Sequence, residues 1–337
     1  MSNETTEQAP ASEAPAHPEV QQVVVPDGAY VSVENLVVRY GRFTAVDGIS
    51  FGISKGAVFG FIGPNGAGKS STIKVLATLM KPTKGKALIG GKNVVNHADA
   101  IRRQIGYVPD AFGVYEDLNV EEYLHFFAAA YKIPRKDRKG VIGDVLELTD
   151  LSTKHGSPVD GLSRGMKQRL SIARVLLHDP ELLLLDEPAS GLDPRARIEM
   201  RELLKELQRM GKTILISSHI LSELAQLCSM IGIIEAGKMI AHGELEDLFK
   251  QLDLKRVVHV QFARDDDGLD DRVRAISGVT AVQREADRLS VQIAEGDIAV
   301  EALHEAIHAL GAGIRMFQPE ALDMETAFMK LTQGKTA

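Results

Sequence analysis

The sequence lacks a second cysteine, a long apolar run and a surplus of basic residues, and each absence excludes a class of protein. Cys228 stands alone, so an internal disulfide is excluded and a reducing compartment fits the chain. No apolar stretch approaches the roughly 18 residues that a membrane-spanning helix requires. Arg39 is the first basic residue, so the N-terminus lacks the positive start of a secretory signal. We therefore expect a cytoplasmic chain that does not itself cross a membrane.

The missing basic surplus argues against nucleic acid as a partner. The formal net charge is −7, and the Lys and Arg residues are not clustered, whereas a nucleic-acid binder carries a basic patch. Hydrophobic residues make up 44% of the chain and charged residues 25%, as in ordinary globular proteins, so disorder throughout is excluded. At about 150 residues per domain, the length of 337 residues suggests two domains.

The pattern along the chain predicts a tail, an α/β domain and a smaller domain. Residues 1–28 are rich in Pro, Glu, Gln and Ala, which predicts a disordered tail. Over residues 29–252, short apolar strands alternate with helices, which is typical of a largely parallel sheet in an α/β fold. The part at about 111–178 is almost entirely helical in pattern and predicts an inserted helical subdomain. Residues 253–337 follow the order strand, helix, two strands, helix and strand, which predicts a small α+β ferredoxin-like domain.

A glycine-rich motif follows the predicted strand at 57–62 and precedes the predicted helix at 70–80. It matches the pattern G-x-x-x-x-G-K-[ST], whose backbone N–H groups and following helix N-terminus bind phosphate. Lys69 would hold the β- and γ-phosphates, and Ser70 would bind Mg²⁺. A glycine-rich turn that contains lysine by chance is the alternative, and the strand and helix on either side argue against it. The residues that we expect to bind nucleotide are Gly63, Pro64, Asn65, Gly66, Ala67, Gly68, Lys69, Ser70 and Ser71.

Two carboxylates end a run of four leucines at residues 182–185. Asp186 suits Mg²⁺, bound through water, and Glu187 could polarise an attacking water as general base. Acidic residues also end strands without any catalytic role, and for this segment on its own that alternative is equally good. The phosphate-binding motif elsewhere in the chain favours the catalytic interpretation.

The segment at residues 162–169 is LSRGMKQR and resembles the LSGGQ signature of ATP-binding cassette (ABC) ATPases. The resemblance covers roughly residues 30–245 and implies a P-loop NTPase core. It also implies that Tyr40 stacks on adenine, and that His219 is the switch histidine that contacts the γ-phosphate. Each alone would be an ordinary tyrosine or histidine, but their order and spacing favour the family roles.

The same resemblance implies that a second copy of the chain completes the site. Ser163 and Gly165 occupy the positions with which the family meets the γ-phosphate across a dimer, and Asp193 belongs to a segment, residues 190–193, that resembles the D-loop. Only one complete phosphate loop and one signature are present, so two copies would sandwich the nucleotides between them. The implied activity is ATP hydrolysis, with ATP and Mg²⁺ as the implied cofactors.

Two departures from the family pattern affect these expectations. Asp110 follows Tyr-Val-Pro where the family usually has a glutamine that touches Mg²⁺ and responds to the membrane partner. A carboxylate can still face Mg²⁺, so we expect Asp110 to be a metal ligand. In the signature, Arg164 replaces the first glycine and Met166 replaces the glutamine. Arg164 would either attract phosphate or point to solvent, and the sequence leaves both open.

This form of the signature resembles that of cassette ATPases serving ABC-2 type, mostly exporting, permeases. The resemblance implies an ATP-hydrolysing subunit that powers transport through a separate integral membrane permease, peripheral on the cytoplasmic face of the inner or plasma membrane. It also implies that the C-terminal domain is an accessory domain. A non-transport cytosolic ABC ATPase is the alternative, but such relatives usually carry two cassettes or a long coiled coil, and neither appears in this sequence. A P-loop kinase would have no use for the signature or the switch histidine.

Overall fold

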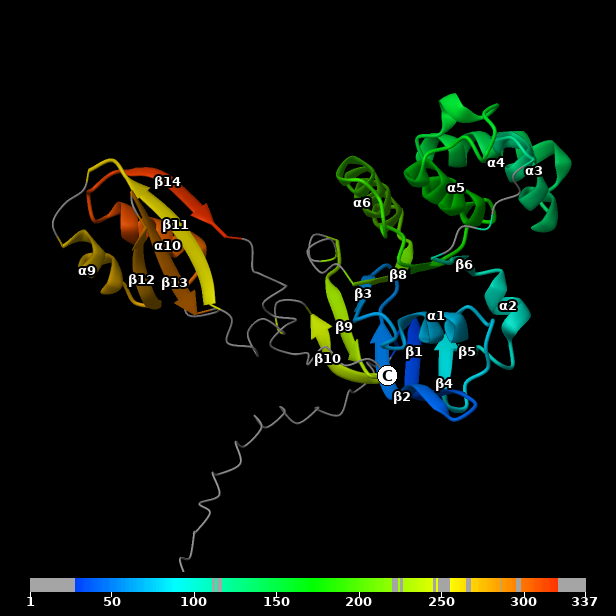
Figure 1. Cartoon of the computed structure of the whole chain (residues 1–337), viewed down its shortest axis with the longest axis horizontal. Coiled ribbons are helices and arrows are strands. Elements are labelled where there is room, and N and C mark those ends of the chain that lie inside the picture. Colours follow the sequence, from blue (N-terminus) through cyan, green and yellow to red (C-terminus); the bar gives the residue numbers. More distant parts are fainter. Residues whose placement is uncertain are drawn as a thin grey trace, which may run out of the picture.

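A computed structural model arranges the chain as three β-sheets with associated helices (Figure 1). The structure describes residues 28–320, except 111–112, 114–116, 220–223, 225–226, 245–246, 248–254, 265–267, 286 and 295–297. The predicted tail therefore lies outside the described residues, apart from its last residue, as does most of a helix predicted at 220–227. Among the described residues, no helix combines the length and the apolar character that crossing a bilayer requires.

The largest sheet is mainly parallel, as the alternating pattern predicts. Its strand order is β10-β9-β3-β8-β7-β6, and every neighbouring pair except β10 and β9 is parallel. Its central strands are apolar runs that are buried along their whole length, as expected for a sheet covered on both faces. Because parallel strands end at one edge, Ile62, Asp186 and Ser218 reach the same edge. The strands are β3 (Val58–Ile62), β6 (Ile105–Val108), β7 (Leu182–Asp186), β8 (Thr213–Ser218), β9 (Met230–Glu235) and β10 (Lys238–Glu244).

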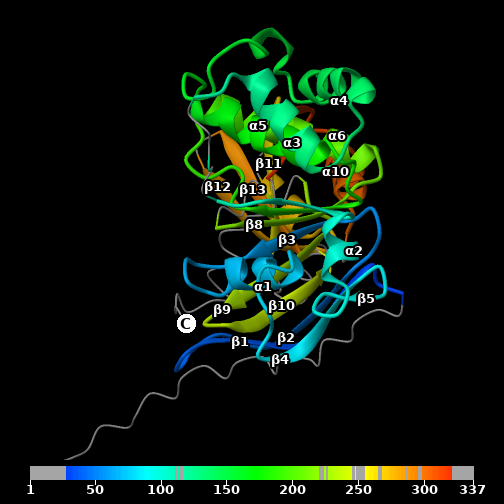
Figure 2. The same cartoon turned by 90° about the vertical axis from the view of Figure 1, so that its right-hand side faces the viewer.

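An antiparallel sheet covers one face of the parallel sheet, with α1 (Lys69–Leu76) between the two (Figure 2). Its strand order is β2-β1-β4-β5. The ring of Phe51 on β2 stacks on Phe59 of β3, with centroids 5.2 Å apart, so the two sheets share one apolar core. The elements are β1 (Val31–Tyr40), β2 (Phe43–Ile53), β4 (Lys84–Ile89) and β5 (Lys92–Asn93), followed by α2 (Ala98–Arg102).

The start of β2 differs from the sequence prediction. The apolar pattern predicts a strand from residue 49, whereas β2 begins at Phe43. That prediction was wrong because residues 45–48 include Ala, Asp and Gly, which are depleted in strands. Pairing with β1 extends the strand instead, and Phe43 lies opposite Tyr40. The hairpin therefore carries two aromatic side chains at its tip.

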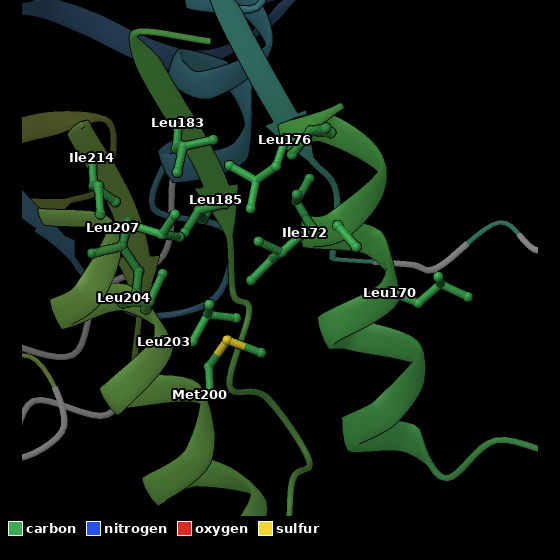
Figure 3. Close-up of a cluster of buried hydrophobic side chains, with 14 of the residues drawn as sticks. Leu170, Ile172, Leu176, Leu183, Leu185, Met200, Leu203, Leu204, Leu207 and Ile214 are labelled. Carbon is green, nitrogen blue, oxygen red and sulfur yellow. The ribbon is translucent and has the colours of Figure 1, made fainter. Parts of the chain in front are cut away.

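Helices cover the opposite face of the parallel sheet (Figure 2). Figure 3 shows Ile172 and Leu176 of α5, and Leu207 of α6, beside Leu183 and Leu185 of β7. The apolar pattern predicts a helix at 166–177, whereas α5 begins at Arg164. It begins earlier because the Ser163 hydroxyl caps it by accepting a hydrogen bond from the Met166 N–H at 3.3 Å. The helices are α3 (Val120–Ala130), α4 (Arg135–Leu148), α5 (Arg164–Leu176) and α6 (Pro194–Arg209), with a 3₁₀ turn at Ser152–Lys154.

Arg169 on α5 joins three helices from a buried position. Its side chain is 9% exposed, and Nη1 donates hydrogen bonds to the Thr149 carbonyl oxygen (3.2 Å) and to Asp150 Oδ2 (2.9 Å), both just past α4. Its Nη2 lies 3.4 Å from Glu199 Oε2 on α6. The guanidinium therefore fixes α5, whose N-terminus carries Ser163, against α4 and α6.

Arg169→Ala is expected to lower the free energy of unfolding by about 2 kcal/mol, because it removes a buried guanidinium and leaves the carbonyl oxygen of the buried Thr149 without this donor. Urea unfolding followed by circular dichroism measures the loss. Arg195→Ala is the matched control, since Arg195 lies 3.0 Å from the same Glu199 but its side chain is 90% exposed. Such an exposed pair contributes about 0.5 kcal/mol or less. Equal losses of unfolding free energy in the two variants would show that the buried position of Arg169 adds nothing to its contribution to stability.

Residues 255–320 form an antiparallel sheet with two helices. The chain order is β11, α9, β12, β13, α10 and β14, and the sheet order is β12-β13-β11-β14. This confirms the predicted ferredoxin-like arrangement, with an apolar core that includes Val258, Leu289 and Ile307. The boundary predicted near residue 252 lies outside the described residues and stays a prediction. The elements are β11 (Lys255–Phe262), α9 (Leu269–Arg274), β12 (Val279–Glu285), β13 (Arg288–Ala294), α10 (Val300–His308) and β14 (Ile314–Pro319).

Candidate functional site

The phosphate loop, residues 63–68, connects β3 to α1 and requires glycine at two points. A Cβ on Gly63 would lie 2.2 Å from the Ile234 carbonyl oxygen on β9. Gly68 has a φ of 108°, and a Cβ there would lie 2.5 Å from the Ala45 carbonyl oxygen on β2. The loop can therefore pack against both strands only because these positions lack side chains. It leads directly into α1, whose N-terminus favours an anion.

Lys69 begins α1, and its ammonium lies against the loop. Nζ donates hydrogen bonds to the carbonyl oxygens of Gly63 (2.6 Å) and Pro64 (3.2 Å), and it lies 3.3 Å from Glu187 Oε1. The side chain is 5% exposed, and a buried ammonium requires such partners. The structure thus places a cation at the phosphate loop, where a bound anion would meet it.

Asp186 and Ser70 meet at the edge of the parallel sheet. The Ser70 hydroxyl donates to Asp186 Oδ1 at 3.1 Å, and the Ser217 hydroxyl donates to the same oxygen at 2.7 Å. Asp186 is 2% exposed. A hydroxyl beside a buried carboxylate fits Mg²⁺, which prefers oxygen ligands and usually keeps water and substrate phosphate among them. No group of three or more His, Cys, Asp or Glu suited to a metal occurs among the described residues, so substrate and water would supply the remaining ligands.

Glu187 follows β7 directly and has a strained backbone, with a φ of 51°. Its N–H donates to the Ser217 hydroxyl at 3.0 Å, which supports this conformation. Its Oε2 lies 2.8 Å from Nδ1 of His219, which follows β8. Its Oε1 pairs with Lys69 and accepts no hydrogen bond from the described part of the chain. The structure therefore brings Glu187, His219 and Lys69 together and leaves one carboxylate oxygen able to accept a proton from water.

Asp110 lies just past β6 and lines the same pocket as the phosphate loop. The pKa of the neighbouring Tyr107 is raised to about 12 by burial and, to a smaller degree, by the negative charges of Asp186 and Asp110. Both carboxylates therefore lie near the Tyr107 phenol. The pocket is lined by Tyr40, Phe43, Ala45, Asn65, Gly66, Ala67, Gly68, Lys69, Ser70, Ser71, Asp110 and Glu187.

The tip of the β1–β2 hairpin forms another wall of this pocket. Tyr40 and Phe43 are 46% and 48% exposed. The Tyr40 hydroxyl lies 3.2 Å from the Ser71 hydroxyl on α1, so Ser71 contacts the tyrosine as well as lining the pocket. Phe43 was not identified from the sequence, because its position depends on the early start of β2 and belongs to no motif.

Five residues expected to bind nucleotide do not line this pocket. Gly63 and Pro64 accept hydrogen bonds from Lys69 with their carbonyl oxygens, and the other three are Ser163, Gly165 and Asp193. Ser163 and Asp193 cap α5 and α6, and Asp193 Oδ1 accepts a hydrogen bond from the Ala196 N–H at 3.0 Å. Gly165 lets the two helices approach closely, since a Cβ there would lie 2.8 Å from the Ala196 Cβ. Within one chain, Ser163 and Asp193 are exposed at the starts of α5 and α6, and Gly165 is buried between the two helices.

Arg164 contacts the loop that follows Glu187. Its guanidinium atoms lie 2.5 to 2.8 Å from the position that a Cβ on Gly191 would take. The side chain is exposed, as in the solvent alternative left open by the sequence, but its end rests on Gly191. In this chain, the arginine therefore links the start of α5 to residues 190–193.

Comparison with known proteins assigns the chain to a family. Residues 46–190 match the family described as ABC transporter. The linearmycin resistance ATP-binding protein LnrL of Bacillus subtilis (strain 168) is 32% identical over 308 residues, which cover 91% of this chain and 99% of that protein. The chain belongs to the ABC transporter ATP-binding family. The ABC family member called Nod factor export ATP-binding protein I, from Ralstonia nicotianae, is 39% identical over 65% of this chain and 68% of its own length.

Solved structures agree with this assignment. An ATP-binding subunit of an ABC transporter is 33% identical, with a TM-score of 0.60, over 66% of this chain and 92% of that one. CbiO1 from Clostridium perfringens, described as part of the ABC transporter complex cbiONQ, is 29% identical, with a TM-score of 0.61, over 66% of this chain and 90% of its own. The predictions of an ABC ATPase and of a P-loop NTPase core are confirmed. As an ABC ATPase, the chain binds and hydrolyses ATP.

Proposed function

We propose that this ABC ATPase hydrolyses Mg-ATP as a dimer and powers export through a separate ABC-2 type integral membrane permease. The cluster at the edge of the parallel sheet carries the proposal, because Glu187 contacts both Lys69 and His219 there, beside Ser70 and Asp186. The cluster supplies a cation, a base and oxygen donors for a metal ion, which phosphoryl transfer to water requires. Phosphate release from ATP by the full chain, alone and with its permease, tests the proposal. Absence of release in both preparations would overturn it.

The proposed reaction is an attack of water on the γ-phosphorus. One P–O bond forms and the bond to ADP breaks, without a covalent intermediate on the protein. Glu187 Oε1 accepts the proton that the water loses, and His219 orients the carboxylate through its contact with Oε2. Lys69 exchanges the carbonyls of Gly63 and Pro64 for phosphate oxygens and stabilises their negative charge.

Ser70, Asp186 and Asp110 are the residues that would hold Mg²⁺. When bound, the ion neutralises charge on the β- and γ-phosphate oxygens. The contact between the Ser70 hydroxyl and Asp186 supports this role, as does the position of Asp110 in the lining of the same pocket.

Asp110→Asn is expected to raise the Mg²⁺ concentration for half-maximal ATPase activity about fivefold and to lower activity at limiting Mg²⁺. It removes one negative charge near the ion, an effect of about 1 kcal/mol in a partly hydrated pocket. Titration of turnover with Mg²⁺ at saturating ATP measures the shift. Asp99→Asn is the control, since this side chain is 89% exposed on α2. An unchanged Mg²⁺ dependence in Asp110→Asn would reject Asp110 as a metal ligand.

A second copy of the chain is proposed to complete each site. Ser163, Gly165 and Asp193 lie outside the pocket of their own chain, at the starts of α5 and α6. A partner would present these helix starts, which favour an anion, to the γ-phosphate. Bound nucleotide would then favour the closed pair, and hydrolysis would release it.

Export is supported by what related proteins are called. LnrL is named for linearmycin resistance, and the Ralstonia protein is named for Nod factor export. We place this chain at the cytoplasmic face of the inner or plasma membrane, bound to its permease. Co-purification with an integral membrane protein would support this placement, whereas co-sedimentation with ribosomes would favour a non-transport ABC ATPase.

A further inference from the structure

The hairpin of β1 and β2 presents two aromatic rings to the nucleotide pocket. Tyr40 and Phe43 lie opposite each other in the strand register, at the two ends of the turn. Both line the pocket with the phosphate loop. Each keeps close to half of its surface exposed, although most large apolar side chains in this part of the chain are buried. An exposed aromatic side chain beside a phosphate loop provides apolar area that a planar ligand group can cover.

The two rings differ in how they are held. The Tyr40 hydroxyl contacts the Ser71 hydroxyl at 3.2 Å, so α1, which begins with the phosphate-binding lysine, also orients the tyrosine ring. Phe43 has no polar atom and can offer a ligand only its ring. The polar side chains in the lining belong to residues 65–71, Asp110 and Glu187, apart from the Tyr40 hydroxyl that contacts Ser71. The end of the pocket at the hairpin is therefore suited to contact the face of a planar ring in a ligand.

We propose that Phe43 is a second base-contacting residue, which forms with Tyr40 a two-ring surface for the nucleotide base. The inference rests on the proposed nucleotide site and adds a residue that determines affinity for the base. Stacking is tolerant of base identity because every base has a π-face. The surface therefore strengthens binding of adenine and guanine nucleotides alike and contributes nothing to phosphate binding.

The test compares ligands with and without a base. Isothermal titration calorimetry on the full chain gives dissociation constants for ADP, GDP and pyrophosphate, none of which the ATPase reaction consumes. Phe43→Ala is expected to weaken ADP and GDP about five- to tenfold, the lower part of the range for loss of one stacking ring. Pyrophosphate affinity is expected to stay unchanged. Phe43→Leu keeps apolar volume without a ring, and its affinity for ADP and GDP is expected to fall nearly as much as that of Phe43→Ala.

Control variants separate this inference from the proposed function. Phe126→Ala removes an equally exposed ring on α3 (49% exposed) and is expected to leave all three affinities unchanged. Lys69→Met is expected to weaken the binding of pyrophosphate and of both nucleotides. If Phe43→Ala keeps wild-type ADP affinity, if Phe43→Leu binds ADP like wild type, or if pyrophosphate weakens in parallel with ADP, the base-contacting role of Phe43 is overturned. If wild-type chain binds none of the three ligands, the proposed nucleotide site itself fails.

Discussion

Glu187→Gln is expected to reduce the rate of ATP hydrolysis by about 10²- to 10⁴-fold while ATP binding stays within about threefold of wild type. The loss is the usual contribution of a positioned general base. Glutamine has nearly the same shape but cannot take a proton from water. The contacts with His219 and Lys69 place Glu187 in the pocket. Its Oε1 accepts no hydrogen bond from the described residues and is the atom that would accept the proton. Phosphate release under saturating ATP, with ATP affinity measured separately, distinguishes lost chemistry from lost binding.

A second glutamate provides the matched control for Glu187→Gln. Glu181 precedes the same strand, β7, and its exposed carboxylate pairs with Lys55 at 2.7 Å, away from the pocket. Glu181→Gln is expected to hydrolyse ATP at the wild-type rate. Wild-type hydrolysis in Glu187→Gln would exclude this residue as the base. Loss of ATP affinity along with activity would indicate instead that Glu187 only supports the pocket.

Lys69→Met is expected to weaken ATP binding by about two orders of magnitude or more, with a corresponding loss of hydrolysis at cellular nucleotide concentrations. Methionine fills the space of the lysine stem but removes the buried ammonium. Loss of one member of a buried, hydrogen-bonded charge pair costs about 2 to 5 kcal/mol of binding free energy. The ammonium is 3.3 Å from Glu187 and hydrogen-bonded to the loop carbonyls, so it is already positioned at the phosphate loop.

Lys74→Met, a change on the exposed side of the same helix α1, controls for a general effect of losing a lysine. It is expected to bind ATP like wild type. Circular dichroism of Lys69→Met verifies that the chain still folds, because removing the lysine leaves Glu187 without its cation. Undiminished ATP affinity in folded Lys69→Met would contradict the proposed phosphate site and, with it, the proposed mechanism.

The phosphate loop and the acidic pair could be located from the sequence because each is a local pattern. The glycines at 63 and 68 mark places where the backbone passes other strands too closely for a side chain. Asp186 and Glu187 end a buried parallel strand, and such strands deliver their last residues to one edge. The ferredoxin-like order of the C-terminal part also follows from local patterns, since each strand and helix is short and strongly periodic.

The remaining features depend on how distant segments pair. Phe43 enters the pocket because β2 pairs with β1 along residues whose local pattern does not indicate a strand. The contact between Lys69 and Glu187 follows from the order of β3, β8 and β7 in the sheet. The contact of Arg164 with Gly191 depends on the packing of α5 beside α6. No local sequence motif indicates any of these contacts.

The close packing of α5 on α6 affects when the two nucleotide sites of the proposed dimer would open. Three contacts join the start of α5 to α6 and to the loop before it. Gly165 packs against Ala196, Arg164 against Gly191, and Arg169 pairs with Glu199. In the proposed dimer, the first helix start serves the partner's nucleotide, while the loop before α6 adjoins the chain's own Glu187. Opening of the dimer at one nucleotide would therefore also displace residues beside the other nucleotide. The two sites would then open together rather than one after the other.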